Sequence, residues 1–157
     1  MREALLVDGG GPAGRSGSGH RSVPHTADLR VEAWAPTAEG CIGELVHAVV
    51  GSFADLSGAR IVGERACTVL AVSDPDLLAG VLEEVIYRMD VHGELPVAIA
   101  FGAIEGLDGA RSVEVRFRMA DAATAEVVGA VPKAVSLHGL ELSSGPDGWT
   151  CAATVDV

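Results

Sequence analysis

The last ten residues alternate apolar and polar side chains, which is the pattern of a strand buried on one face only. One parity is apolar and the other more polar: Trp149, Cys151, Ala153 and Val155 against Thr150, Ala152, Thr154 and Asp156. The pattern predicts a strand over residues 148–157. Asp156 is expected on its polar face, next to the terminal carboxylate of Val157.

A second extended run, over residues 131–142, precedes this strand and is joined to it by turn-forming residues over 143–148. Two such runs flanking Ser, Gly, Pro and Asp predict an antiparallel hairpin. If the hairpin is centred near Gly145, Lys133 lies level with Val157. We therefore expect one cationic group and two anionic groups at one end of the sheet.

Asp28 opens a third alternating run, with Leu29 and Val31 on one face and Arg30 on the other. If this run pairs antiparallel with residues 148–157, the start of one strand meets the end of the other. Asp28 and Asp156 would then share a polar face. Periodicity permits this pairing without selecting it, and the alternative is that both aspartates are ordinary surface acids.

Apolar residues at spacings of three and four predict two amphipathic helices. The first begins after Pro36-Thr37 and ends near Gly58, and the second starts with Asp74 as N-cap and Pro75 as first residue. Further strands are expected over residues 65–72, 97–104 and 112–119. This order predicts a single α+β domain, with a mixed or antiparallel sheet and both helices packed on one face.

The chain of 157 residues carries 22 acidic and 11 basic residues, for a formal net charge of -11. Such a chain repels polyanions, so direct nucleic-acid binding is not expected. The negative electrostatic field of such a chain favours binding of a divalent cation or of a basic protein partner. The acidity could also serve solubility alone.

The cysteines, the N-terminal residues and the lack of a long apolar stretch indicate the compartment in which the protein is expected. Cys41, Cys67 and Cys151 are far apart in the sequence and form no CxxC pair, so we interpret them as small buried side chains in a reducing compartment. Residues 1–19 are rich in Gly and Ser and are expected to be a disordered leader before a domain over 20–157. No apolar stretch is long enough for a membrane span, so a cytoplasmic protein is expected.

Four ordered motifs resemble the archease family. They are the opening His25-Thr26-Ala27-Asp28, the helix end Tyr87-Arg88-Met89-Asp90, the segment from Pro132-Lys133 to His138, and the ending Asp156-Val157. The chain departs from the family pattern at Ser136-Leu137, where Thr-Tyr is usual. It also lacks the usual Gly-Glu segment before Lys133.

This resemblance implies a protein cofactor rather than an enzyme. Archeases promote guanylylation and multiple turnover of RtcB-type, GTP-dependent RNA ligases in tRNA splicing and RNA repair. By correspondence with the family motifs, Asp28, Asp156 and the Val157 carboxylate would bind a metal and Lys133 would support activity. Hard carboxylate oxygens favour Ca²⁺, with Mg²⁺ and Mn²⁺ as alternatives.

Several other interpretations stay open at this stage. His25, Asp90 and His138 could support the metal ligands through hydrogen bonds, although a purely structural role suits both histidines. The chain could instead be an acidic chaperone or interaction module that acts without metal. A metal-dependent phosphohydrolase is less favoured, because the dense His and Asp ligand sets of two-metal hydrolases are missing.

Overall fold

The structure is a computed structural model that describes residue 18 and residues 28–157. The leader expected over residues 1–19 lies outside the described residues except for Ser18, and His25 lies outside them as well. Within the described part, the elements are β1 (Asp28–Ala35), α1 (Ala38–Gly51), β2 (Ala54–Asp55), β3 (Ile61–Ala71), α2 (Asp74–His92), β4 (Glu94–Phe101), β5 (Arg111–Asp121), a 3₁₀ turn η3 (Ala122–Thr124), β6 (Glu126–Val127), β7 (Ala134–Val135), β8 (Glu141–Gly145) and β9 (Gly148–Asp156).

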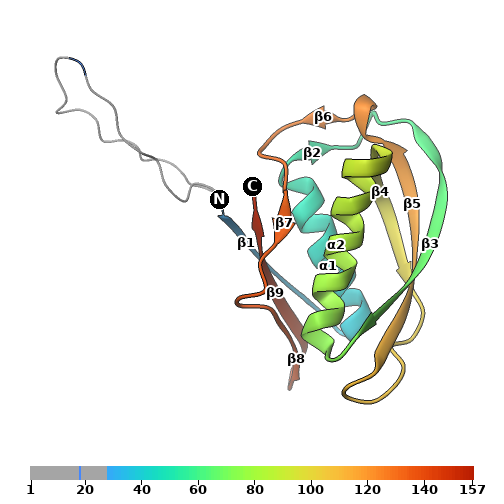
Figure 1. The fold of residues 1–157 in the computed structure, drawn as a ribbon, viewed down its shortest axis with the longest axis vertical. Helices are drawn as coiled ribbons and strands as arrows, with labels where there is room; N and C mark the ends of the chain where they lie inside the picture. Colours follow the sequence, from blue (N-terminus) through green and yellow to red (C-terminus); the bar gives the residue numbers. More distant parts are fainter. Residues whose placement is uncertain (1–17, 19–27) are drawn as a thin grey trace.

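The described strands pair antiparallel in two main sheets and one small ribbon (Figure 1). In the first sheet, β9 is the central strand, with β1 along one edge and with β7 and β8 along the other. In the second sheet, β5 lies between β3 and β4, while β2 and β6 form the ribbon. The predicted α+β class with two main helices is confirmed, with the strands divided among several sheets instead of one.

Helix α1 begins where the sequence predicts and ends earlier. Thr37 is its N-cap, and the Thr37 Oγ1 atom accepts a hydrogen bond of 3.0 Å from the Gly40 N–H. The predicted end near Gly58 is wrong, because the helix stops at Gly51. The N–H and hydroxyl of Ser52 donate to the last helical carbonyls, and the chain then enters β2.

Helix α2 begins close to the predicted start but has a different N-cap. The Ser73 Oγ atom accepts from the Asp76 N–H at 3.3 Å, so Ser73 is the cap and Asp74 lies inside the first turn. Acidic side chains there interact favourably with the positive end of the helix dipole. Gly93 ends the helix in the left-handed conformation, with φ 65°. Neither described helix is long and apolar enough to cross a membrane.

The core lies where both helices contact strands of both sheets (Figure 1). The apolar stripes predicted on the helices are largely buried, and β5 contributes the alternate residues Val113, Val115, Phe117 and Met119. The predicted strands over 65–72, 97–104 and 112–119 correspond to β3, β4 and β5, with ends shifted by a few residues. Aliphatic side chains dominate the described core, as the low aromatic content indicates.

Two of the three cysteines are buried, and they contact each other. Cys41 on α1 and Cys151 on β9 have exposed fractions of 0% and 3%, whereas Cys67 on β3 is only partly buried. The interpretation of Cys67 as a buried side chain is therefore wrong, because it is only partly buried at the edge of the core. Burial, followed by the contact with Cys41, raises the pKa of the Cys151 thiol well above its ordinary value of 9.0.

This shift predicts that the reduced protein loses stability above about pH 9. In the unfolded chain the Cys151 thiol ionises near its ordinary pKa, while the folded thiol stays protonated, so the unfolded state binds fewer protons there. The free energy of unfolding should then fall by up to about 1.4 kcal/mol per pH unit for this group. Urea unfolding at about pH 8 and about pH 10, with a phosphine reductant, measures the loss. A Cys151→Ala variant with the same loss would contradict this assignment.

Candidate functional site

The register of the first sheet brings Asp28 and Asp156 together. Asp28 starts β1, Asp156 ends β9, and the two residues are directly opposite each other in the antiparallel pair. Side chains of paired residues point to the same face, with Cβ atoms about 4.5–5.5 Å apart. Both residues are exposed, so their carboxylates lie on the outer face of the sheet. The pairing that periodicity permits without selecting is therefore the one that forms, and the two aspartates meet.

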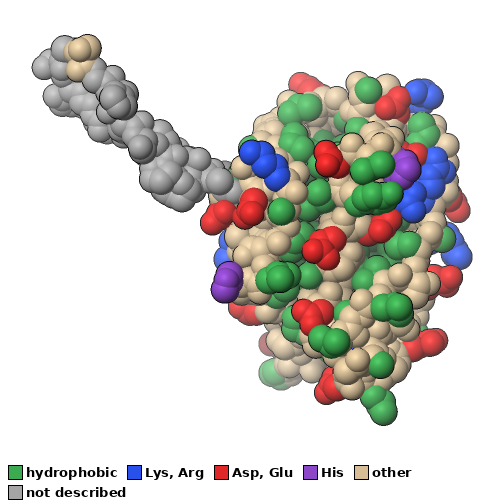
Figure 2. Space-filling view, in the orientation of Figure 1, with side chains coloured by type: hydrophobic (Ala, Val, Ile, Leu, Met, Phe, Trp, Pro, Cys, Tyr) green, Lys and Arg blue, Asp and Glu red, His purple; other side chains and the backbone are tan. Residues whose placement is uncertain are grey.

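Lys133 approaches from the other edge of β9. Its backbone N–H donates to the Asp156 carbonyl oxygen at 2.7 Å, and the next residue, Ala134, pairs with Asp156. Lys133 is thus level with Val157, as the hairpin count predicts, and it is exposed. Figure 1 shows the end of β9 beside the starts of β1 and β7, and Figure 2 shows acidic and basic side chains together at this end of the sheet.

The segment that carries Lys133 is not the continuous strand predicted over residues 131–142. From Ala134 to Glu141 the chain advances seven residues, whereas their partners on β9, Asp156 and Ala152, are four residues apart. The loop between β7 and β8, over residues 136–140, accommodates these three additional residues. Gly139 permits this loop because its φ of 73° lies in the left-handed region.

The two aspartates face each other as like charges, which is unfavourable across a strand pair. The nearby Arg30 is directed elsewhere: its guanidinium lies 3.0 Å from Glu141 Oε2 and 3.7 Å from Glu32 Oε2. Among residues 28–157, no ion pair reaches Asp28 or Asp156. A cation at this position would therefore relieve the repulsion between the two carboxylates.

The donor set fits a hard divalent ion but is incomplete. Carboxylate oxygens are the ligands that Ca²⁺ and Mg²⁺ prefer. The described residues contain no group of three or more His, Cys, Asp or Glu side chains placed to hold a metal. Asp28 and Asp156 would supply two ligands, and the Val157 carboxylate and water would have to supply the others. The ligand role of these residues stays a prediction.

The supporting residues lie at different places. Asp90, near the end of α2, lines a hollow of about 360 Å³ together with Lys133, Pro132 and Met89. This hollow connects the end of α2 to the segment that carries Lys133, and the sequence pattern did not predict its apolar walls. The local sequence pattern places Met89 in a helix and Pro132 in the extended segment before the hairpin. Only the tertiary structure shows that the two residues line the same hollow.

His138 lies in the loop between β7 and β8, outside the aspartate pair. Its backbone N–H donates to the Ser136 Oγ atom at 3.2 Å, and its imidazole forms no hydrogen bond with another described residue. No hydrogen bond between described residues joins the His138 side chain to Asp28 or Asp156. His25 lies outside the described residues, so its predicted supporting role has no structural description.

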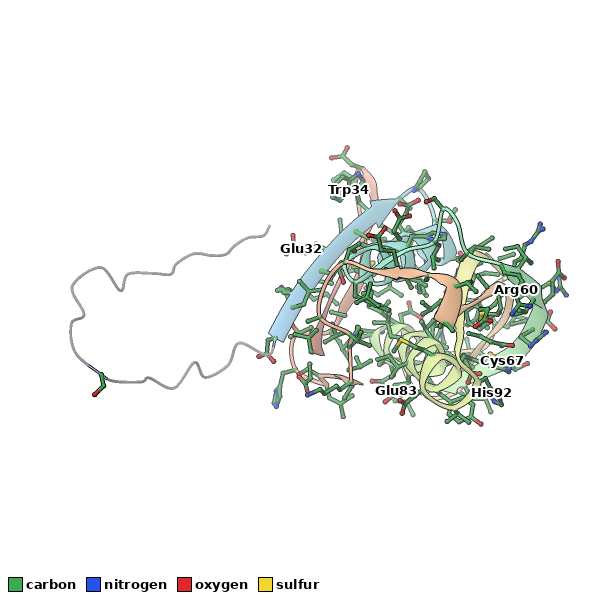
Figure 3. All side chains as sticks on the ribbon, turned by 90° about the horizontal axis from the view of Figure 1, so that it is seen from above. Glu32, Trp34, Arg60, Cys67, Glu83 and His92 are labelled. Carbon is green, nitrogen blue, oxygen red and sulfur yellow. The ribbon has the colours of Figure 1, made fainter. Side chains whose placement is uncertain are left out.

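A second surface feature lies at the opposite end of β1 and β9. The Trp34 side chain is 75% exposed and borders a hollow of about 500 Å³ beside the β8–β9 turn. Figure 3 shows Glu32 and Trp34 projecting from the outer side of β1, away from the helices. The position of Trp34 on the polar parity of its strand is the signal that could have identified this feature from the sequence.

The archease protein family matches residues 20–157 of the chain, which is most of its length. The chain belongs to the archease family. Two strains of Mycobacterium tuberculosis, CDC 1551 / Oshkosh and H37Rv, each have a "probable protein archease" that is 53% identical to it over 154 residues, or 98% of this chain and 82% of the relative.

Two solved structures share the archease fold. The solution structure of Methanobacterium thermoautotrophicum protein 1598 has a TM-score of 0.69 at 19% identity, over 84% of this chain and 94% of that one. The crystal structure of a Thermotoga maritima protein, described as an archease and possible chaperone, has a TM-score of 0.58 at 17% identity, over 90% and 100%. At such identities the likeness establishes the fold alone.

Proposed function

We infer that this archease activates an RtcB-type, GTP-dependent RNA ligase as a protein cofactor. The observation that carries the proposal is the direct pairing of Asp28 with Asp156 in a chain of the archease family. The pairing places two exposed carboxylates on the outer face at one end of the sheet, where a partner protein can reach them, and the exposed Lys133 lies level with Val157 at the same end. The proposal rests on this pair of carboxylates and on family membership, because a fold alone does not specify a function.

The residues at this end of the sheet have separable tasks in this proposal. The Asp28 and Asp156 carboxylates hold negative charge on a rigid strand pair, so they are positioned before the partner arrives. Lys133, whose backbone N–H donates to the Asp156 carbonyl oxygen, lies at the same end of the sheet. Its exposed side chain borders the hollow that Asp90 lines and can contact an anionic group of the partner. A divalent ion, Ca²⁺ first among them, would supply a positive charge for orienting phosphate oxygens when bound.

The test of this function is RNA ligation under multiple-turnover conditions. An RtcB-type ligase, from the same source where one exists, is supplied with GTP, excess RNA ends and a divalent cation. Stoichiometric wild-type protein is expected to convert a limited first round of joining into continued turnover. An unrelated acidic protein of similar size serves as the control. No stimulation of guanylylation or turnover by the wild-type protein would overturn the proposal.

An acidic interaction or chaperone module that acts without metal is the second candidate. It is favoured by the incomplete ligand set, because only two carboxylate side chains converge among the described residues. Stimulation that is unchanged by varying the divalent cation at fixed ligase loading would favour this candidate. The phosphohydrolase alternative has no support in the described ligand groups, and measurable phosphoesterase turnover by the protein alone would be needed to revive it.

The proposed role of the Val157 carboxylate predicts a difference between terminal extensions. A chain that ends at Val157 should bind Ca²⁺ about tenfold more tightly than a chain extended by several neutral residues, since the extension removes one anionic ligand. The same extension placed at the N-terminus is the control. Isothermal titration calorimetry measures both affinities, and equal affinities for the two extended chains would exclude Val157 as a ligand.

A further inference from the structure

Two buried thiols lie in contact between the first helix and the central strand of the first sheet. Cys41 Sγ donates to Cys151 Sγ at 3.0 Å, and both residues are free cysteines. The two are 110 residues apart in the chain. Cys151 Sγ also donates to the Cys41 carbonyl oxygen at 3.3 Å, so the contact involves both the side chain and the backbone of α1.

The separation of the two sulfurs is close to that of a bond. A disulfide has an S–S length of about 2.05 Å, roughly 1 Å shorter than the contact seen here. Small rotations of the two side chains can cover that difference while α1 and β9 keep their places. Cys67 does not compete for either thiol, because it lies on β3 in the other sheet and faces Glu84 and Arg88 of α2.

We propose that Cys41 and Cys151 are an oxidative modification site that reacts with low-molecular-weight disulfides to form a reversible bond between α1 and β9. One cysteine, as its thiolate, attacks a sulfur of the small disulfide and releases one small thiol. The second thiolate then attacks the protein sulfur of the mixed disulfide and releases the other small thiol. The two protons leave with the two released thiols, so two protein thiols are oxidised while one small disulfide is reduced.

Burial controls when this reaction occurs. The thiolate is the nucleophile in thiol–disulfide exchange, and the buried Cys151 thiol resists ionisation. A small disulfide also has no access to two side chains that are at most 3% exposed. Exchange therefore requires transient separation of α1 from β9, and the pair stays reduced while the surrounding thiol pool is reduced.

The bond would connect α1 to the first sheet, which carries the aspartate pair. Cys151 pairs with Ala33 across the β1–β9 interface, and the same register continues to Asp28 and Asp156. Oxidation would therefore tie this strand pair covalently to α1. Because the bond also closes a long loop in the unfolded chain, the oxidised protein should unfold at a higher urea concentration than the reduced protein.

Oxidation of the full chain in a glutathione redox buffer tests the proposal. The reduced protein is incubated with oxidised glutathione at mildly alkaline pH, in urea just below the unfolding transition, and free thiols are then alkylated. The intact mass should be lower by two hydrogen atoms, because one disulfide has formed. It should also include one added alkyl group, located on Cys67. Peptide mapping should give one linked pair, Cys41 with Cys151. Reductant should reverse both the mass change and the higher unfolding midpoint.

Two variants make the result specific. Cys67→Ala should form the same bond and carry no alkyl group, whereas Cys151→Ala should form no internal bond. Glutathione retained on Cys41 or Cys151, a linked peptide that contains Cys67, or three alkylated thiols would each overturn the proposal. A lower unfolding midpoint for the oxidised protein would also overturn it, because the bond would then require displacement of α1 or β9.

Discussion

Replacing Asp156 with asparagine is expected to abolish ligase activation while the protein stays folded. The side chain is exposed, and asparagine has nearly the same shape, so the backbone pairing of residue 156 with Asp28 and Ala134 is retained. The substitution removes one of the two opposed carboxylates. Turnover in the ligation assay should fall to the level of the ligase alone, and Asp28→Asn should have the same effect.

Stability measurements separate this loss of function from a loss of structure. Without a divalent cation, the free energy of unfolding of Asp156→Asn should equal that of the wild type or exceed it by up to about 1 kcal/mol, because a like-charge pair is removed. Added Ca²⁺ should stabilise the wild-type protein and leave the variant unchanged, since binding to the folded state alone shifts the unfolding equilibrium.

The matched control for this substitution is Asp147→Asn. Asp147 is an exposed aspartate in the turn between β8 and β9, about 30 Å along the strand from Asp156. It makes the same change in net charge without touching the aspartate pair, so activation and Ca²⁺ response should remain as in the wild type. A folded Asp156→Asn protein with full activation would refute the assignment of the site.

Replacing Phe117 with alanine is expected to lower the free energy of unfolding by about 3–5 kcal/mol. Phe117 is fully buried on β5, the central strand of the second sheet, where it pairs with Arg65 and Ile99 on the neighbouring strands. Truncation removes buried apolar surface and leaves a cavity that aliphatic neighbours on two layers cannot fill completely. For a domain of marginal stability, such a loss is a large part of the total.

Arg118→Ala is the control on the next residue of the same strand. Its side chain is exposed on the opposite face of β5, so its removal should change the free energy of unfolding by no more than about 0.5 kcal/mol. Urea titrations of the three proteins measure the difference. If Phe117→Ala lost less than about 1 kcal/mol, the described packing of the second sheet against the helices would be contradicted.

The sequence predicts which face of each strand is polar and approximately where each helix begins. Strict alternation placed Asp28 and Asp156 on polar faces, and both residues are exposed in the structure. The Thr37 cap and the Gly93 stop of the helices also follow from local chemistry. These features depend on interactions within a few residues, which is the range that periodicity and capping patterns report.

The course of residues 131–142 shows where local reasoning fails. An apolar-rich run predicts one strand, yet the chain forms two short strands separated by a loop around Gly139. The turn is centred between Gly145 and Gly148 instead of on Gly145, which alone would move the partner of Lys133 three residues along β9. The three additional residues between β7 and β8 cancel this shift, so Lys133 still lies level with Val157. The correct position of Lys133 therefore came from an incorrect description of the segment.

The sequence by itself determined the α+β class, the amphipathic helices, the polar faces that carry the aspartates and the resemblance to archeases. Only the tertiary structure decided that β1 is the neighbour of β9, that Lys133 and Asp90 line one hollow, and that Cys41 lies against Cys151. The physical reason is the range of the forces involved. Backbone geometry and side-chain alternation act over neighbouring residues, whereas strand pairing and core packing are selected by the burial of apolar surface across the whole chain.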